Sequence, residues 1–301
     1  MKHAIGIDVG GTNTRVALVD EDMNLLERIQ FPTPAEDPVA AIGKIAEAID
    51  SLEGEDLAGI GISCPGPLDL KKGQIIVTPN LDPRWFGYPL VGELSARTGL
   101  AVTLENDANL ATLAEAVVGE GRDKRYVQFL TISTGLGSGF VVDKKIYQGA
   151  HGFANEVASA CMWQDGPQSG VLAPGGIEAI SSGTAITHRA RQAGLTVAHA
   201  GEVNDLALEG SPAAQSIMAD AKNYLANFIG VIYAINDPEI VILGGSVALK
   251  IPGFAEEVEA LVREKALPAV RPYVHVVRST LNEDSGLLGA AYLAFSNGSA
   301  R

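Results

Sequence analysis

Apolar runs that end in glycine turns recur along the chain. The run Ile5–Val9 ends at Gly10 and Gly11, and a second apolar run, Val16–Val19, follows at once. This pattern predicts a strand, a tight glycine turn and a second strand. Residues 127–142 repeat the order about 125 residues later, around the turn Thr134–Gly137, which predicts two similarly built domains.

Helical periodicity alternates with these strand patterns. Residues 39–52 place Ile42, Ile45 and Ile49 on one face, which is the spacing of an amphipathic helix. A third apolar run, Glu239–Leu243, ends in the turn Gly244–Ser246. Alternating strands and helices are typical of an α/β protein. Further helices are expected at residues 90–98, 108–118, 213–235, 254–264 and 286–295, and further strands at 57–63, 75–77, 102–104, 146–147 and 273–277.

The glycine turns suit a phosphate ligand. Adjacent glycines let the backbone approach a ligand closely, and their N–H groups can point at phosphate oxygens. Asp8 precedes the first turn, where a carboxylate can hold a phosphate-bound magnesium ion directly or through water. The turn is neither a P-loop, whose spacing is absent, nor a dinucleotide fingerprint, because a strand follows the glycines. An ordinary hairpin turn is the alternative for this stretch alone, and the internal repeat favours the phosphate site.

Polar side chains gather in the segment Glu105–Asn109, at the end of an expected strand and the start of an expected helix. Ligands bind at such junctions in open α/β sheets. Helix capping by Asn and Asp is the alternative, and it leaves Glu105 unexplained. Gly66, in Pro65-Gly66-Pro67, is a candidate for close approach to a ligand, although simple turn chemistry explains it as well.

Two further carboxylates, Glu156 and Glu178, follow glycine-rich segments. Glu156 follows the loop 149–155, whose polar groups a polyhydroxylated substrate could satisfy. Glu178 lies in the first turn of an expected helix, where interaction with the helix dipole is the alternative explanation.

Composition narrows the class of protein. The 301 residues are 47% hydrophobic and 19% charged, and 34 of them are glycine, which suits many tight turns. The net charge of −14 argues against binding a nucleic-acid backbone. The two cysteines, Cys64 and Cys161, suggest neither a disulfide framework nor a zinc ribbon. Without a signal core or a membrane-length apolar run, a cytoplasmic location is expected.

Taken together, these motifs resemble the ROK (repressor, ORF, kinase) family of sugar kinases over nearly the full length. Asp8–Arg15 resembles its first phosphate motif, Ser133–Gly137 its second, Leu243–Ser246 its adenosine motif and Glu105–Asn109 its catalytic segment. The resemblance implies the α/β actin-like ATPase (ribonuclease H-like) fold, with two similar lobes and a cleft between them. The N-terminal lobe is expected to comprise residues 1–118 plus 287–301, and the C-terminal lobe residues 119–286.

The resemblance implies an ATP-dependent kinase that transfers the γ-phosphoryl group to the 6-hydroxyl of a hexose, with glucose as the expected sugar. Mg²⁺ is the implied metal, Asp107 the implied general base, and a homodimer the implied assembly. Together with Gly66, the expected substrate-binding residues are Asn80, Asn106, Asp107, Glu156 and Glu178. The residues expected to hold ATP and magnesium are Asp8, Gly10, Gly11, Thr12, Arg15, Thr134, Gly135, Gly244, Gly245 and Ser246.

One departure from the family concerns zinc. Family members commonly carry a structural zinc site, and the corresponding positions here are Ser159, Ser169, Val171 and Gly176. Cys161 alone cannot make a tetrahedral site, so zinc is predicted absent. The missing histidine also contacts sugar in zinc-bearing kinases. Either His151 or Ser159 could take over that contact, and an ordinary loop histidine is the alternative for His151.

Three other functions stay open on the sequence. An N-acylhexosamine kinase, acting on N-acetylmannosamine or N-acetylglucosamine, could use the same scaffold. A non-catalytic sugar sensor or repressor is disfavoured by Asp107, by the acidic charge and by a chain that starts at the first phosphate strand. A structural actin-like ATPase gives no reason for Glu156 and Glu178. The choice of sugar depends on residues 150–178, where the family pattern is broken.

Overall fold

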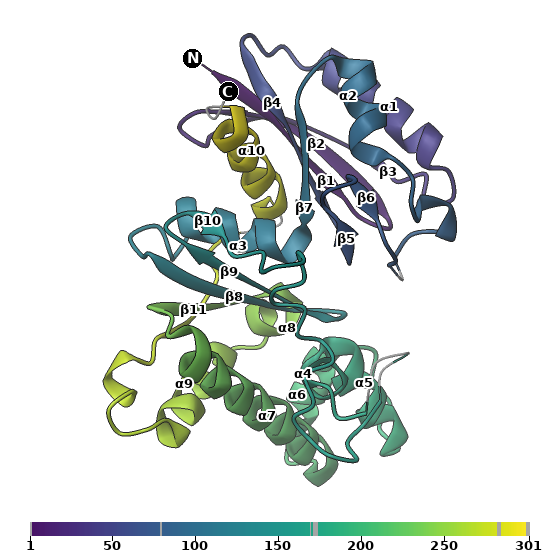
Figure 1. Cartoon of the computed structure of the whole chain (residues 1–301). Coiled ribbons are helices and arrows are strands. Elements are labelled where there is room, and N and C mark those ends of the chain that lie inside the picture. The colour runs from purple at the N-terminus through teal and green to yellow at the C-terminus, as the bar shows by residue number, and fades with distance from the viewer. Residues whose placement is uncertain (1, 79, 169, 171–173, 282–283, 299–301) are drawn as a thin grey trace. The chain divides into compact units, whose positions relative to one another are not determined.

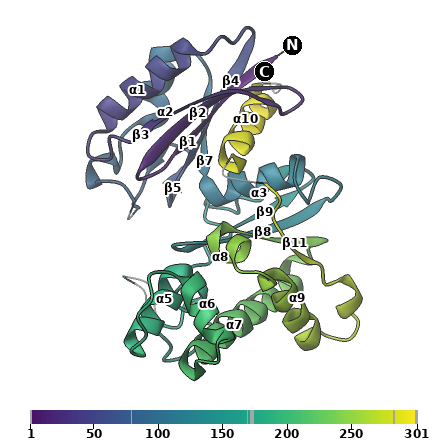
Figure 2. The same cartoon turned by 180° about the vertical axis from the view of Figure 1, so that it is seen from behind.

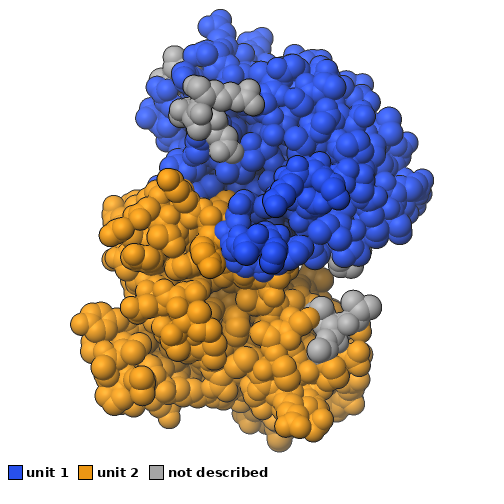
Figure 3. Space-filling view, in the orientation of Figure 1, with its two compact units in different colours: residues 1–118, 148–154, 281–301 blue, residues 119–147, 155–280 orange. Residues whose placement is uncertain are grey.

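Two compact units make up the computed structural model of the chain, which describes residues 2–78, 80–168, 170, 174–281 and 284–298 (Figures 1 and 2). Unit 1 comprises Met1–Val118, Gln148–Ala154 and Leu281–Arg301. Unit 2 comprises Gly119–Tyr147 and Asn155–Thr280 (Figure 3). The segment Gln148–Ala154 therefore belongs to unit 1 although the chain on both sides of it belongs to unit 2.

Unit 1 is built on a five-stranded mixed sheet of order β3-β2-β1-β4-β7. β1 pairs antiparallel with β2 and parallel with β4, and β4 pairs parallel with β7. The strands are β1 (His3–Val9), β2 (Asn13–Asp20), β3 (Leu25–Pro32), β4 (Leu57–Cys64) and β7 (Val102–Asn106), and a small separate sheet pairs β5 (Leu68–Asp69) with β6 (Gln74–Ile75).

Unit 2 repeats this design. Its sheet has the order β10-β9-β8-β11-β12, with β8 antiparallel to β9 and parallel to β11. Numbered within each sheet, both orders are 3-2-1-4-5, so the internal repeat predicted from the glycine turns is confirmed. The strands are β8 (Tyr126–Ile132), β9 (Leu136–Val142), β10 (Lys145–Ile146), β11 (Ile240–Gly244) and β12 (Val276–Arg278).

Helix α10 covers the centre of the first sheet, where it packs on β1, β4 and helix α3. The contact is close because glycines stand at the crossing. A Cβ at Gly61 would lie 1.9 Å from the Ala290 carbonyl oxygen, and one at Gly289 would lie 2.0 Å from that of Leu110. Neither position could carry a side chain without moving the backbone. The helices of unit 1 are α1 (Pro38–Ser51), α2 (Leu90–Thr98), α3 (Asp107–Val117) and α10 (Ser285–Gly298), with the short 3-10 turn η1 (Pro83–Trp85).

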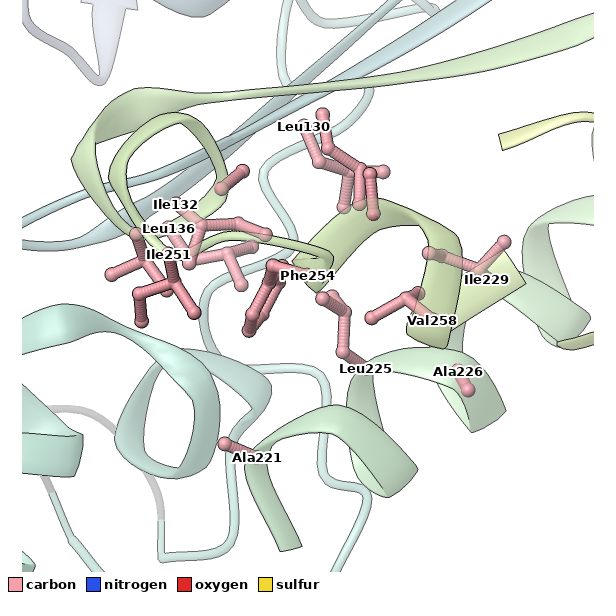
Figure 4. Packing of buried hydrophobic residues seen from close by; sticks show 14 of the residues in the cluster. Leu130, Ile132, Leu136, Ala221, Leu225, Ala226, Ile229, Ile251, Phe254 and Val258 are labelled. Atoms are coloured by element: carbon pink, nitrogen blue, oxygen red, sulfur yellow. The ribbon is translucent and has the colours of Figure 1, made fainter. Parts of the chain in front are cut away.

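The core of unit 2 lies between its sheet and the long helix α7 (Pro212–Asn236). Leu130 from β8 and Phe254 and Val258 from α9 (Phe254–Lys265) meet apolar side chains of α7 such as Leu225 (Figure 4). The remaining helices are α4 (Ile177–Ser181), α5 (Gly183–Gln192), α6 (Ala200–Leu208) and α8 (Gly245–Lys250), with the 3-10 turn η2 (Arg271–Tyr273).

Most predicted elements appear within one or two residues of their expected bounds. The strand expected at 273–277 is instead a 3-10 turn followed by the short β12, and α5 and α6 were not predicted. Within the described residues, we find no helix with the length and apolarity needed to cross a bilayer.

Candidate active site

Asp8 lies at the edge of the first sheet where three parallel strands end. In the register of this sheet Asp8 stands beside Ser63 of β4, and Ser63 stands beside Glu105 of β7. Ser63 Oγ donates a hydrogen bond of 2.9 Å to Asp8 Oδ1, and Arg15 Nη1 lies 3.7 Å from Asp8 Oδ2. Burial raises the pKa of Asp8, and Ser63 and Arg15 oppose that rise. The carboxylate is thus fixed in direction at the ligand-binding edge of the sheet.

The first glycine turn connects β1 to β2 at this edge. The Gly10 N–H donates to the Asn13 carbonyl at 3.0 Å. A Cβ on Gly11 would lie 2.3 Å from the Asn80 carbonyl oxygen, so the glycine lets the loop that carries Asn80 reach the turn. Thr12 and Asn80 are both exposed there. The structure therefore brings a predicted sugar-binding residue beside the predicted phosphate turn.

In the segment Glu105–Asn109, some polar side chains form hydrogen bonds within the protein and one, Asp107, is exposed. Asn106 caps α3 by accepting hydrogen bonds from the Ala108 and Asn109 N–H groups at 2.9 and 3.3 Å. Glu105 is 1% exposed and accepts from Asn109 Nδ2 at 3.0 Å and from Gln148 Nε2 at 2.5 Å. Capping and packing thus account for these two residues. Asp107, the first residue of α3, is exposed.

Two small residues complete this edge of unit 1. A Cβ on Gly66 would lie 3.1 Å from Asn106 Nδ2, so Gly66 allows the close approach of the Asn106 side chain. Cys64 is fully buried, and burial, with smaller effects from Asp107 and Asp8, raises the pKa of its thiol. The thiol is therefore neutral and packs as an apolar group.

The second glycine turn, in unit 2, holds Glu178. The Leu136 N–H donates to Glu178 Oε2 at 2.9 Å, and a Cβ on Gly135 would lie 2.6 Å from the same oxygen. Glu178 is therefore more than a first-turn helix residue, because one of its oxygens is fixed on the turn that follows β8. Thr134 is exposed beside it.

The third glycine turn ends β11 and opens α8. Gly245 has φ of +80°, and a Cβ there would lie 2.5 Å from the Ile132 carbonyl oxygen. Ser246 Oγ lies 3.3 Å from Ser133 Oγ, so the second and third turns meet. The three residues predicted here, Gly244, Gly245 and Ser246, therefore lie next to the turn that carries Thr134.

A cavity of about 660 Å³ opens beside these two turns in unit 2. Its lining includes Thr134 and Ser246 from the two turns, Ala200 of α6, and Ile251, which follows α8. Asn204, 7% exposed, also lines it and has no hydrogen-bond partner for its side chain among the described residues. Sequence reasoning missed these wall residues. The spacing of Ala200, Gly201, Asn204 and Asp205, which lies on one helical face, was the available signal.

Glu156 lies in unit 2, two residues before the base of the loop that leads to α4. It is exposed, yet desolvation by the surrounding protein raises the pKa of its carboxyl group. It has no hydrogen-bond partner in the part of the chain that the structure describes. His151 is exposed and belongs to unit 1.

The described residues fit the expected magnesium ion and offer little to a zinc ion. Mg²⁺ usually takes one or two carboxylates together with water and phosphate oxygens, and the oriented Asp8 fits that requirement. Zinc is different, because Cys161 Sγ points at the Pro174 carbonyl oxygen, 3.7 Å away, and Gly176 is buried. No group of three or more His, Cys, Asp or Glu that could hold a metal occurs among the described residues. Ser169 and Val171 lie outside those residues, and the absence of zinc stays a prediction.

Two five-stranded sheets of one topology, each with a glycine turn after its first strand, define the class as the actin-like ATPase fold. The chain belongs to the ROK family, whose model matches residues 4–297.

Relatives cover nearly the whole chain. A glucokinase of Thermotoga maritima is 34% identical, with 95% of each chain covered. An N-acetylmannosamine kinase of Salmonella typhimurium is 31% identical over 96% of this chain and 97% of its own. The ROK hexokinase of Thermus thermophilus superposes with a TM-score of 0.90 at 31% identity, covering 99% of this chain and 100% of its own. A ROK glucokinase of Streptomyces griseus, solved with glucose and AMPPNP, has a TM-score of 0.78 at 28% identity, covering 98% of this chain and 99% of its own.

Proposed function

We propose that the protein is an ATP-dependent hexose kinase that transfers the γ-phosphoryl group to the 6-hydroxyl of glucose. The observation that carries the proposal is the pairing of an oriented Asp8 with an exposed Asp107 at one sheet edge, in a chain with full-length glucokinase relatives. Phosphoryl transfer needs positioning and charge stabilisation rather than covalent chemistry, and these two carboxylates supply groups suited to both tasks.

The chain's own residues have distinct tasks in this proposal. Asp107 accepts the proton of the attacking sugar hydroxyl. The hydroxyl oxygen bonds to the γ-phosphorus while the bond between that phosphorus and the ADP oxygen breaks. Asp8, held by Ser63 and Arg15, would hold Mg²⁺ through water. Magnesium, when bound, supplies neutralisation of the phosphate charge. The turn that carries Gly10 and Gly11 joins β1 to β2 at the same edge.

The cavity of unit 2 suits the nucleotide. Thr134 and Ser246 in its lining offer hydroxyl groups to phosphate oxygens, and Asn204 in the same lining offers an amide to a base. Gly135, Gly244 and Gly245 shape the two turns at its mouth. The sugar would be bound by Asn80, Asn106, Glu156 and Glu178, because hydroxyl hydrogen bonds discriminate strongly against analogues that lack them.

The base is tested by Asp107→Asn, assayed as glucose-dependent ADP release. The amide keeps the shape of the side chain but accepts no proton, so kcat is expected to fall about 10²- to 10⁴-fold. Glu115→Gln, on the same helix but buried, serves as a control for helix stability. Unchanged turnover in folded Asp107→Asn would remove Asp107 from the mechanism.

A second candidate is an N-acylhexosamine kinase, which the N-acetylmannosamine kinase relatives favour. A panel of glucose, mannose, N-acetylmannosamine and N-acetylglucosamine in the same assay separates the two. Preference for an acylated sugar by kcat/KM would replace glucose with that substrate and leave the phosphotransfer mechanism unchanged. A cytoplasmic homodimer is the assembly and location we propose with either activity.

A further inference from the structure

The loop between Glu156 and Glu178 is closed at its base by backbone hydrogen bonds. The Glu178 N–H donates to the Ala158 carbonyl at 3.2 Å, and the Ile177 N–H donates to that of Ala160 at 3.0 Å. The Met162 N–H donates to the Gly175 carbonyl at 2.8 Å. Residues 158–162 and 175–178 thus form one short antiparallel base. Glu156 and Glu178 both lie at the end of this base away from Met162 and Gly175, so a displacement of the base would move both.

Beyond the base, Trp163 is held between two helices. Its ring stacks on Tyr224 of α7, with centroids 5.1 Å apart and planes 6° from parallel. The Arg189 guanidinium of α5 lies 5.6 Å from the Trp163 ring centroid. Arg189 Nη2 in turn forms an ion pair of 2.5 Å with Asp220 of α7. We name these four residues, Tyr224, Trp163, Arg189 and Asp220, the aromatic clamp.

Arg189 depends on the Trp163 ring to offset part of the cost of burying one guanidinium nitrogen. Its side chain is 13% exposed, and its Nη1 is buried with no hydrogen-bond partner among the described residues. A buried N–H donor without a partner is costly even though Asp220 pairs with the charge of Arg189, and an aromatic face offsets part of that cost. The Trp163 ring supplies that face.

The clamp is coupled to the base through Gly175. The Trp163 N–H donates to the Gly175 carbonyl at 3.3 Å, and Gly175 has φ of +71°. A Cβ on Gly175 would lie 1.7 Å from the Trp163 carbonyl oxygen, so the two backbones touch. Movement of the Trp163 backbone would therefore displace Gly175, and Gly175 lies three residues before Glu178.

We propose that Trp163 is a positioning residue for sugar binding, which acts by holding the loop base and thereby the carboxylates of Glu156 and Glu178. The role in sugar binding rests on the proposed function, whereas the contacts of the aromatic clamp do not depend on it. Glu178 is additionally fixed by the Leu136 N–H, whereas the Glu156 side chain has no hydrogen-bond partner among the described residues.

The test compares Trp163→Ala and Trp163→Phe in the full chain, with KM measured separately for glucose and ATP. An aromatic pair contributes about 2- to 12-fold to an equilibrium, so Trp163→Ala is expected to raise the glucose KM about 10-fold. The ATP KM is expected to change less than about 2-fold, because the clamp does not line the nucleotide cavity. Trp163→Phe restores the glucose KM, since it keeps an aromatic face.

Tyr126→Ala is a matched control, because Tyr126 also lies beside an arginine in unit 2, with Arg125 5.5 Å from its ring centroid. It is expected to leave both KM values unchanged. Tyr224→Leu removes the stacking partner without touching the loop and is expected to raise the glucose KM as Trp163→Ala does. It keeps the proposal testable if Trp163→Ala does not fold.

Amide hydrogen exchange of Ile177 and Glu178 gives a second readout that needs no turnover. Faster amide exchange at Ile177 and Glu178 in Trp163→Ala, with unchanged exchange in α9, supports the proposal that the clamp holds the loop base. An unchanged glucose KM in folded Trp163→Ala, or an equal rise in both KM values that Trp163→Phe does not reverse, overturns it. If the wild type phosphorylates no sugar, the proposed function fails, and unchanged exchange at Ile177 and Glu178 would then overturn the clamp independently.

Discussion

Asn204 presents an amide to the cavity that we assign to the nucleotide, and adenine offers a donor and an acceptor side by side that match an Asn amide. Asn204→Leu keeps the size and removes both groups. We expect the ATP KM to rise about 5- to 10-fold with a smaller change for GTP, the loss typical of one or two neutral hydrogen bonds. Asp205→Asn, in the same cavity, is the control. An unchanged ATP-to-GTP ratio in Asn204→Leu would exclude base recognition by this residue.

Glu156 is expected to determine how the glucose kcat/KM depends on pH at the acid side. Its pKa is raised by burial above the ordinary 4.5, so the carboxylate is protonated, and loses acceptor capacity, at a higher pH than a free glutamate. The glucose kcat/KM is expected to fall as pH drops through this raised pKa, and Glu156→Gln should lack that acid limb. An acid limb that persists in Glu156→Gln would assign it to another group.

The same shift has a stability consequence. A folded-state pKa above the unfolded one means that stability is fully present below the unfolded pKa and is lost as pH rises through the folded pKa. Glu156→Gln is therefore expected to raise the thermal midpoint at pH 7 slightly, and to leave it unchanged near pH 3. Calorimetry at the two pH values checks this, and a lower midpoint at pH 7 would show that the ionised carboxylate stabilises the fold.

Single residues also show where sequence reasoning stops. The types and positions of Asp8 and Asp107 follow from local motifs, since each lies at the end of a strand pattern. Glu178 on the Leu136 N–H and Glu105 on Gln148 join residues 42 and 43 positions apart, and no local pattern specifies such contacts. The aromatic clamp was not predictable for the same reason.

At the scale of elements, the third glycine turn is the most constrained. Gly245 combines a left-handed φ with a Cβ position 2.5 Å from the Ile132 carbonyl oxygen, whereas Gly194 has φ of +85° and open space. Gly194→Ala should therefore cost about 1 kcal/mol, from backbone strain alone, and Gly245→Ala about 3 kcal/mol or more, because the clash adds to that strain. Chemical denaturation measures both. Equal losses would mean that the contact with Ile132 relaxes without cost.

Long helices with many apolar residues were predictable, and short helices with few large apolar residues were not. The helix expected at 213–235 is α7, whose buried face repeats at helical spacing. Helix α5 is short and has only one large apolar residue, Ile186, so its sequence gives little signal for a helix. The strand expected at 273–277 is shortened because Arg271–Tyr273 forms a 3-10 turn.

For the whole molecule, the repeated glycine motif made the duplicated sheet predictable, because both copies carry the same strand–turn–strand pattern. The membership of Gln148–Ala154 in unit 1 was not predictable, since it depends on contacts between residues distant in sequence, of which the Gln148–Glu105 hydrogen bond is one.

Metal dependence is a prediction at this scale. Chelation with EDTA should abolish kinase activity, and added Mg²⁺ should restore it, because the phosphate charge must be neutralised. The thermal midpoint of unfolding should stay unchanged by chelation, because only a structural zinc would contribute directly to folding. Metal analysis should find no stoichiometric zinc. A midpoint that falls with EDTA and returns with Zn²⁺ would contradict the predicted absence of zinc.

The central claim is phosphoryl transfer from ATP to the 6-hydroxyl of a hexose. The most direct measurement is product analysis by phosphorus NMR with glucose and with 6-deoxyglucose, which lacks only the acceptor oxygen. We predict stoichiometric ADP and glucose 6-phosphate with glucose, and no sugar phosphate with 6-deoxyglucose, which should instead inhibit competitively. A phosphorylated 6-deoxyglucose, or no sugar phosphate from any hexose or acylated hexosamine, would contradict the account.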